Sequence, residues 1–230
     1  MRFENTETFN FEGALRGMRN PMNSWNKSDS YWDFPEHPDK FVIGKNDLTL
    51  AQNLIKAGGE HRKFMRQIFV SVDITAPLYW WKEFDTYKVG TVANSTSTMH
   101  KLTSHPITDE CFELDDFNDV ICDGITFLFE VDSIWDEVID TLEQLRQIYL
   151  KTKDKRIWKE LIRLLPESYL QTRTITMSYE NIFNIINQRK NHKLNEWSGM
   201  DNPDLSNFIS WAKTLPYANE LLFVSKEEDN

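Results

Sequence analysis

The feature that most constrains the fold is a run of apolar residues at helical spacing between Ile134 and Tyr149. The spacing predicts a long amphipathic helix, one face of which has to be buried against other elements. The apolar positions are Ile134, Trp135, Val138, Ile139, Leu142, Leu145, Ile148 and Tyr149. Hydrophobic residues make up 40% of the chain and charged residues 27%, a composition that supplies a core and excludes disordered and collagen-like proteins.

Strands and further helices are expected on both sides of this helix. Alternation of apolar and polar residues from Gln67 to Ala76 predicts a half-buried strand that Pro77 ends, and a β-branched strand is expected from Leu170 to Met177. Ser178 is a suitable N-cap for a helix after the second strand. Other helices are expected from Asn46 to the stop at Gly58-Gly59, over Leu78–Lys88, over Lys155–Leu165, and after Asp201-Asn202-Pro203. Because no repeat or linker interrupts this order, the sequence predicts a single α+β domain.

Four regions of different composition follow one another along the chain. Residues 1–45 are rich in aromatics, Asn, Asp and Pro without sustained periodicity, so a mostly irregular N-terminal lobe is expected there. Residues 46–225 carry the α+β pattern, interrupted at 103–130 by an acidic insertion. A solvated surface segment explains this insertion better than a calcium site, because the EF-hand spacing is absent. Residues 226–230 are expected to form a flexible charged tail.

The formal net charge is −10, and such a field repels polymeric nucleic acid and anionic membranes. A small anion is still compatible with it, since two or three Arg or Lys side chains can hold one phosphate. Cys111 and Cys122 lack metal-type spacing and suggest reduced thiols, with a disulfide as the alternative. Without a signal peptide or an apolar run long enough to span a bilayer, we expect a cytoplasmic protein. Because the cysteines lack the spacing of metal ligands, no metal site is expected.

Common catalytic motifs are absent from the sequence. It has no Gly-rich phosphate loop, no His-Glu-x-x-His motif and no nucleophile elbow, so the hydrolases, kinases and nicotinamide enzymes that these motifs mark are excluded. A run of small and hydroxyl-bearing residues from Gly90 to Thr98 is instead expected to form a loop that caps helices or lines a polar site.

Two stretches resemble the flavin-dependent thymidylate synthases (ThyX). Leu165-Pro166, the strand ending in Thr176-Met177-Ser178, and the following helix with Asn184 and Arg189 resemble that family's Leu-Pro, Thr-Val-Asn-x-Arg and Asn…Leu-Arg pattern. Ala76-Pro77-Leu78 through Leu102 aligns without a gap with the family's Ala-Pro stretch and signature, so the resemblance covers roughly residues 46–217. It implies a central antiparallel sheet with long amphipathic helices and a homotetramer.

The resemblance also implies a reaction, in which FAD, NADPH and a folate support the methylation of dUMP or an analogous pyrimidine nucleotide. Residues that align with family positions for the nucleotide, or lie next to them, are Glu83, Asn94, Thr96, Thr98, Arg163 and Arg189. Those that align with flavin-contacting positions are His61, Thr86, Tyr87, Lys88, Ser178 and Asn184. The resemblance does not assign a catalytic residue.

The chain departs from the family where the family carries charge. Thr86-Tyr87-Lys88 stands at the Arg-His-Arg of the signature, and Glu180 stands at the strand-end Arg, where it is unfavourable for a flavin phosphate. The basic residues Arg62, Lys63 and Arg66 could compensate, although a solvated turn is the favoured interpretation. For Arg189, Asn184 and His61 the alternative is an ordinary position on the surface.

Three functions are therefore open at this point. The first is an active FAD-dependent nucleotide methyltransferase, an enzyme of thymidylate synthase type. The second is a protein of the same fold that has lost flavin chemistry and binds a nucleotide or a protein partner. The third is an unrelated α+β domain, for which the resemblance would be false.

Overall fold

The computed structural model describes residues 1–114, 131–200 and 206–224, which divide into two compact units. The first unit comprises Met1, Thr75–Thr86 and Asn94–Arg173, and the second comprises Arg2–Ile74, Tyr87–Ala93 and Thr174–Asn230. The domain boundaries expected at residues 45 and 225 remain predictions.

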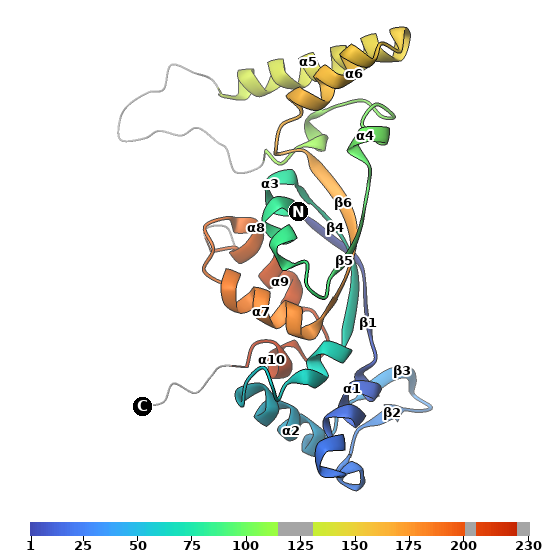
Figure 1. Ribbon diagram of the computed structural model, residues 1–230, viewed down its shortest axis with the longest axis vertical. Coiled ribbons are helices and arrows are strands. Elements are labelled where there is room, and N and C mark those ends of the chain that lie inside the picture. The colour runs from blue at the N-terminus through green and yellow to red at the C-terminus, as the bar shows by residue number, and fades with distance from the viewer. Residues whose placement is uncertain (115–130, 201–205, 225–230) are drawn as a thin grey trace, which may run out of the picture. The chain divides into compact units, whose positions relative to one another are not determined.

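A four-stranded antiparallel sheet confirms the α+β class (Figure 1). Its order is β1 (Arg2–Phe9), β4 (Phe69–Pro77), β6 (Leu170–Ser178) and β5 (Val92–Ser95). The expected strands correspond to β4 and β6. In β4 the side chains of Val70, Val72 and Ile74 are fully buried, which explains why its alternation was visible in the sequence.

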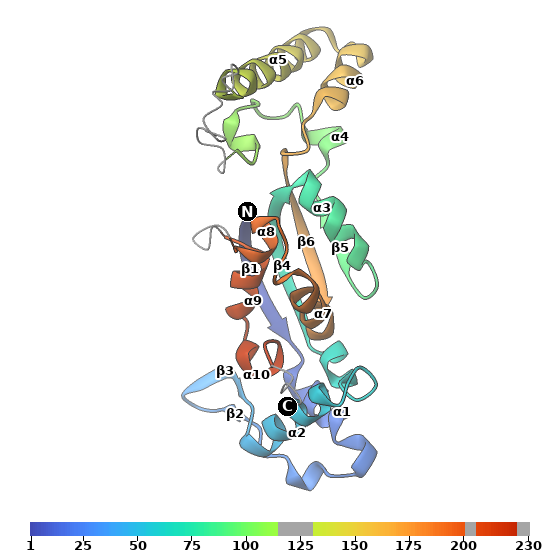
Figure 2. The same cartoon turned by 90° about the vertical axis from the view of Figure 1, so that its left-hand side faces the viewer.

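Helices of the second unit cover one face of its part of the sheet, as the two views show for α7 (Tyr179–Arg189) and α9 (Phe208–Lys213) (Figures 1 and 2). The unit also contains α1 (Phe11–Met18), α2 (Lys45–Lys56), α8 (Asn195–Ser198) and α10 (Ala218–Leu221). Tyr179, Trp197 and Phe208 are completely buried. Aromatic side chains therefore supply much of the apolar area that stabilises this core.

The expectation of a mostly irregular segment over residues 1–45 was wrong. This segment contains β1, α1, two short 3₁₀ turns at Asn20–Met22 and Trp25–Lys27, and an antiparallel hairpin of β2 (Tyr31–Asp33) and β3 (His37–Val42). The sequence pattern does not predict β1, because most of its residues are exposed and polar. The alternation that marks a half-buried strand is therefore missing. The other elements are too short to show a period.

A buried carboxylate, Asp47, connects these N-terminal elements to α2. Its Oδ1 accepts a hydrogen bond from Arg19 Nε at 2.5 Å, and its Oδ2 accepts from the Ser28 and Ser30 hydroxyls, each at 2.6 Å. The backbone N–H groups of Asp29 and Ser30 also donate to Oδ2. Burial alone would raise the pKa of Asp47, but the bonds from Ser28, Ser30 and Arg19 outweigh it and lower the pKa below its usual value.

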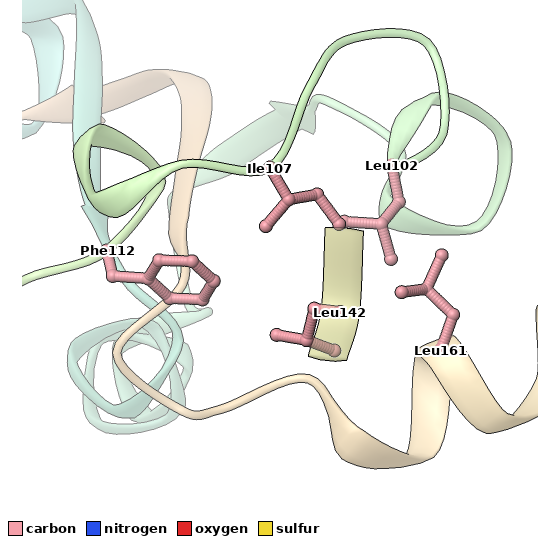
Figure 3. Close-up of a cluster of buried hydrophobic side chains, with 5 residues drawn as sticks. All are labelled: Leu102, Ile107, Phe112, Leu142 and Leu161. Atoms are coloured by element: carbon pink, nitrogen blue, oxygen red, sulfur yellow. The ribbon is translucent and has the colours of Figure 1, made fainter. Parts of the chain in front are cut away.

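The first unit contains a helical hairpin of α5 (Val131–Thr152) and α6 (Lys155–Leu164), which confirms the helices expected over 134–149 and 155–165. It also contains α3 (Leu78–Phe84) and α4 (Thr98–Lys101). The hairpin packs on the segment from Leu102 to Phe112, which follows α4, through a separate apolar cluster (Figure 3). The members of this cluster are Leu102, Ile107, Phe112, Leu142 and Leu161.

An ion pair beside this cluster fixes the 103–107 segment to α5. Arg146 donates to both oxygens of Glu143, at 2.7 and 2.8 Å, and its Nη1 donates to the carbonyl oxygen of Thr103. The backbone N–H of Ile107 donates to Glu143 Oε2 at 2.8 Å. Hydrogen bonds from Arg146 first, and then from Ile107, lower the pKa of Glu143 to about 2. The two side chains neutralise each other, so neither charge is left without a partner beside the apolar cluster.

Some expectations need correction. The segment expected to be a loop over Gly90–Thr98 includes the short exposed strand β5. The helix α9, which carries the apolar residues of the expected last helix, begins only at Phe208, where Asn207 and Ser210 form a capping box. The expected opening of that helix at Asp201-Asn202-Pro203, the part of the acidic insertion from 115 to 130, Cys122 and the 226–230 tail lie outside the described residues. Cys111 carries a free thiol.

Substitution of Asp47 by Asn should destabilise the protein by about 3 to 5 kcal/mol, because the charge of Arg19 remains buried without its partner. Urea unfolding at pH 7 would measure this cost, with Asp136→Asn, an exposed position on α5, as the control. Because the folded pKa of Asp47 is lowered, its contribution is complete above the unfolded pKa of about 3.9 and is lost as the pH falls further. Equal stability of the two variants at pH 7 would contradict this role.

Candidate functional site

The junction between β6 and α7 is held by a capping box. The Ser178 hydroxyl and backbone N–H both donate to Asn181 Oδ1, at 2.6 and 3.1 Å, and the Asn181 backbone N–H donates back to Ser178 Oγ at 3.2 Å. Asn181 Nδ2 also donates to the carbonyl oxygen of Val89 at 2.8 Å. Ser178, a predicted cofactor contact, is thus buried and caps the helix, which confirms its expected role as N-cap.

An ion-pair network follows on the first turns of α7. Arg62 Nε donates to Glu180 Oε1 at 3.2 Å, and Arg66 pairs with the same carboxylate. Arg62 Nη2 donates to Asn184 Oδ1 at 3.1 Å, while its guanidinium carbon lies 4.6 Å from the ring centroid of Phe183. Two cations therefore surround one anion, and the network keeps a net positive charge.

This network corrects the favoured interpretation of Arg62 as part of a solvated turn. The Arg62 side chain is only 17% exposed, and Glu180, expected to repel a phosphate, is 13% exposed and paired with two arginines. The sequence indicated the basic cluster, but its carboxylate partner lies 118 positions away. Lys63 is different: it is exposed and pairs with Glu60 on its own turn.

A cavity of about 220 Å³ adjoins Arg62. Lys56, Gly58, Gly59 and Phe183 are among its lining residues. Gly58 has φ +107°, a backbone conformation that favours glycine. His61, predicted to contact the cofactor, is exposed in the turn after α2 and donates its backbone N–H to Gly58. Backbone without side chains, together with nearby cations, suits an anionic group.

A second cluster surrounds Arg189 at the end of α7. Arg189 Nε donates to the Tyr87 hydroxyl at 2.8 Å, and that hydroxyl donates to Gln188 Oε1 at 3.1 Å. The guanidinium carbon lies 5.6 Å from the ring centroid of Tyr87 and 5.0 Å from that of the buried Trp197. Arg189 is therefore held against two aromatic rings, unlike an ordinary surface arginine.

The structure thus brings five predicted residues of the second unit to two places around α7. Asn184 accepts a hydrogen bond from Arg62, and His61 lies in the turn that precedes Arg62. Ser178 caps the start of the helix, and Tyr87 and Arg189 form the second cluster. The sixth, Lys88, is exposed next to Val89 in the turn that Asn181 holds.

The other six predicted residues belong to the first unit. Thr86 donates its hydroxyl to the Glu83 carbonyl oxygen at 2.7 Å, and Thr96 donates its backbone N–H to Thr172 at 2.9 Å. Thr98 is the first residue of α4, and Asn94 is exposed in β5. Arg163 is exposed on α6 and pairs with Glu160.

Sequence reasoning missed Arg173 on β6. Its Nη1 donates to Asp85 Oδ1 at 3.0 Å and its Nε to Gln171 Oε1 at 3.0 Å, while its guanidinium carbon lies 4.3 Å from the ring centroid of Trp81. The sequence signal for Arg173 was a charged residue between the β-branched residues Thr172 and Thr174. Among the described residues, no group of three or more His, Cys, Asp or Glu could hold a metal ion.

Comparison with known proteins identifies the fold. No model of a protein family matches the sequence, and no curated protein matches it either. Among the solved structures that match over nearly the whole chain are two crystal structures of flavin-dependent thymidylate synthase ThyX from Helicobacter pylori with FAD and dUMP. One has a TM-score of 0.64 at 16% identity, covering 97% of this chain and 98% of that one. The other has a TM-score of 0.68 at 14% identity, covering 99% and 100%.

The α+β architecture described above is therefore the ThyX fold. The resemblance seen in two sequence stretches extends to the whole chain at the level of structure. The low identity agrees with a divergent sequence. No helix of the described residues is both long and apolar enough to cross a membrane.

The capping role of Ser178 can be tested by stability measurements without any ligand. Replacing Ser178 by Ala should lower the free energy of unfolding by about 1 kcal/mol, the usual effect of losing a helix N-cap. Thermal and urea unfolding would measure this, with Ser95→Ala on the exposed strand β5 as the matched control. An unchanged stability would contradict the role of the capping box.

Proposed function

We propose that this protein binds FAD and a pyrimidine deoxynucleotide and methylates the nucleotide, dUMP or an analogue, with a one-carbon unit from a folate. NADPH would reduce the flavin. The observation that carries the proposal is the network of Arg62, Arg66 and Glu180 beside a cavity, in a chain with the ThyX fold. Its net positive charge supports binding of a phosphate-bearing ligand in an acidic protein.

The residues of the second unit at this place suit an anionic group, such as the diphosphate of a flavin dinucleotide. Arg62 and Lys56 supply cations, Gly58 and Gly59 leave the backbone uncovered, and the carboxylate of Glu180 is already paired. Arg62, Asn184 and His61 would hold the cofactor, which when bound supplies hydride to the one-carbon unit. Arg189, oriented by Tyr87, would hold the nucleotide through its planar donor fork.

The remaining assignments are proposals of the same kind. Glu83, Asn94, Thr96, Thr98 and Arg163 are proposed for the nucleotide, and Thr86, Lys88 and Ser178 for the flavin. We also propose a cytoplasmic homotetramer, and a light-scattering mass of one 27.2 kDa chain would contradict the tetramer.

A second candidate function is binding of a nucleotide or a protein partner without flavin chemistry. Thr86 and Tyr87 favour it, because both occupy positions where the resemblance implies charged flavin contacts. Their hydroxyls instead bond within the chain, to Glu83 and to Gln188 and Arg189. Uptake of flavin therefore separates the two candidates.

FAD titration of the flavin-free protein tests the first function. The wild-type protein should bind FAD and develop flavin absorbance, and Arg62→Gln should weaken the affinity about 10- to 100-fold, as expected for losing a charge-assisted hydrogen bond. Lys63→Gln removes the same charge from an exposed neighbour and should bind like wild type. If wild-type protein takes up no FAD, the flavin proposal is wrong and the second candidate is favoured.

Thermal unfolding with dUMP tests the nucleotide assignment. At a concentration of 100 times Kd, dUMP should stabilise the wild-type protein by about 2.7 kcal/mol. Arg189→Gln should abolish most of this gain, whereas Lys190→Gln, an exposed neighbour, should keep it. Equal stabilisation of both variants would contradict the role of Arg189.

A further inference from the structure

A larger cavity, of about 800 Å³, lies within the second unit and shares no lining residue with the site proposed above. Four aromatic residues and two cations dominate its lining: Phe11, Trp32, Phe41, Tyr217, Arg16 and Lys40. They come from α1, the β2–β3 hairpin and the turn before α10. The volume is in the range of pockets that take up small organic molecules.

The aromatic side chains form walls that are fixed by their own contacts. Trp32 and Phe41 lie edge to face with centroids 5.2 Å apart, and Phe11 and Tyr217 do so at 5.7 Å. The Tyr217 hydroxyl donates to the carbonyl oxygen of Phe41 at 3.2 Å and accepts from the backbone N–H of Ile43 at 2.8 Å. Trp32 remains 41% exposed, so an apolar surface is available to a planar ligand.

The turn that presents Tyr217 is unusual. Tyr217 has φ +55°, in the left-handed region that residues with bulky side chains rarely adopt. Its two hydrogen bonds to the end of the hairpin oppose this strain. Non-glycine residues held in this region are concentrated at functional sites, and here the strain places an aromatic ring in the cavity wall.

The charges in the lining favour an anion. The lining holds two cations, Arg16 and Lys40, against one carboxylate, Glu12, which accepts a hydrogen bond from Trp32 Nε1 at 3.1 Å, so the formal charge of the lining is positive. Within the described ranges, neither Arg16 nor Lys40 has a side-chain hydrogen bond or an ion pair. An anionic group bound beside the apolar walls would pair with these two cations.

We propose that this cavity binds a small molecule with a planar aromatic body and one anionic group. The ring of the ligand lies against Trp32 and Phe41, and Arg16 and Lys40 bind the anion. A neighbouring cavity of about 290 Å³ also has Arg16, Trp32 and Phe41 in its lining. The aromatic residues of the hairpin therefore line both cavities. The proposal does not depend on flavin or dUMP binding.

Fluorescence titration with 8-anilinonaphthalene-1-sulfonate, which carries a planar naphthalene ring and one sulfonate group, tests this site on the full chain. The wild-type protein should bind the dye, and the double variant Arg16→Gln/Lys40→Gln should bind it at least tenfold more weakly. Trp32→Leu should weaken it as well. The control Lys27→Gln/Lys213→Gln removes two exposed charges outside the cavity and should bind the dye like wild type.

Circular dichroism melting must show that the variants are folded, and Lys40→Gln alone, at an exposed position, serves if the double variant does not fold. Equal dye affinity in all folded variants would overturn the proposal. Two competitors then distinguish the sources of the anion. Displacement by AMP indicates a nucleoside phosphate, displacement by indole-3-acetate indicates an aromatic carboxylate, and displacement by neither overturns the proposal.

Discussion

The N-terminal part of the second unit depends on the hydrogen bonds that the buried carboxylate of Asp47 accepts. It receives hydrogen bonds from Arg19, which follows α1, and from Ser28 and Ser30, which precede the β2–β3 hairpin. One carboxylate on α2 thereby fixes the ends of several short elements that could not form on their own, since short helices and isolated hairpins are marginal in water. The aromatic cavity between α1 and the hairpin depends on the same carboxylate.

Elements with a repeating pattern of burial could be predicted from the sequence. Along α5 the half-buried and buried residues recur every third or fourth position, and along β4 the buried residues alternate with more exposed ones, so both periods can be recognised in the sequence. β1 could not be predicted, because its polar side chains are mostly exposed and its position follows from pairing with β4. Tertiary hydrogen bonding decides such strands, and a single sequence does not contain that information.

The residues of the candidate site also divide into those that a local pattern predicts and those that depend on contacts distant in sequence. Ser178 was predictable as a cap because capping is local, and Asn184 and Arg189 were found by resemblance to ThyX. The pairing of Arg62 with Glu180 was not predictable, because it joins residues that are distant in sequence. Glu180 looks unfavourable for phosphate binding when it is considered alone. In the folded chain the arginines of the preceding turn reverse the sign of the local charge.

The bond from Asn181 to the carbonyl oxygen of Val89 has a consequence for how this fold changes during evolution. It holds the turn through main-chain atoms, and Gly90, at φ +78°, completes it with a conformation that needs no particular neighbouring side chain. This contact with the turn does not use the side chains of Tyr87 and Lys88. A segment supported in this way can change its side chains one at a time while its backbone persists, which agrees with a ThyX fold at 16% and 14% sequence identity.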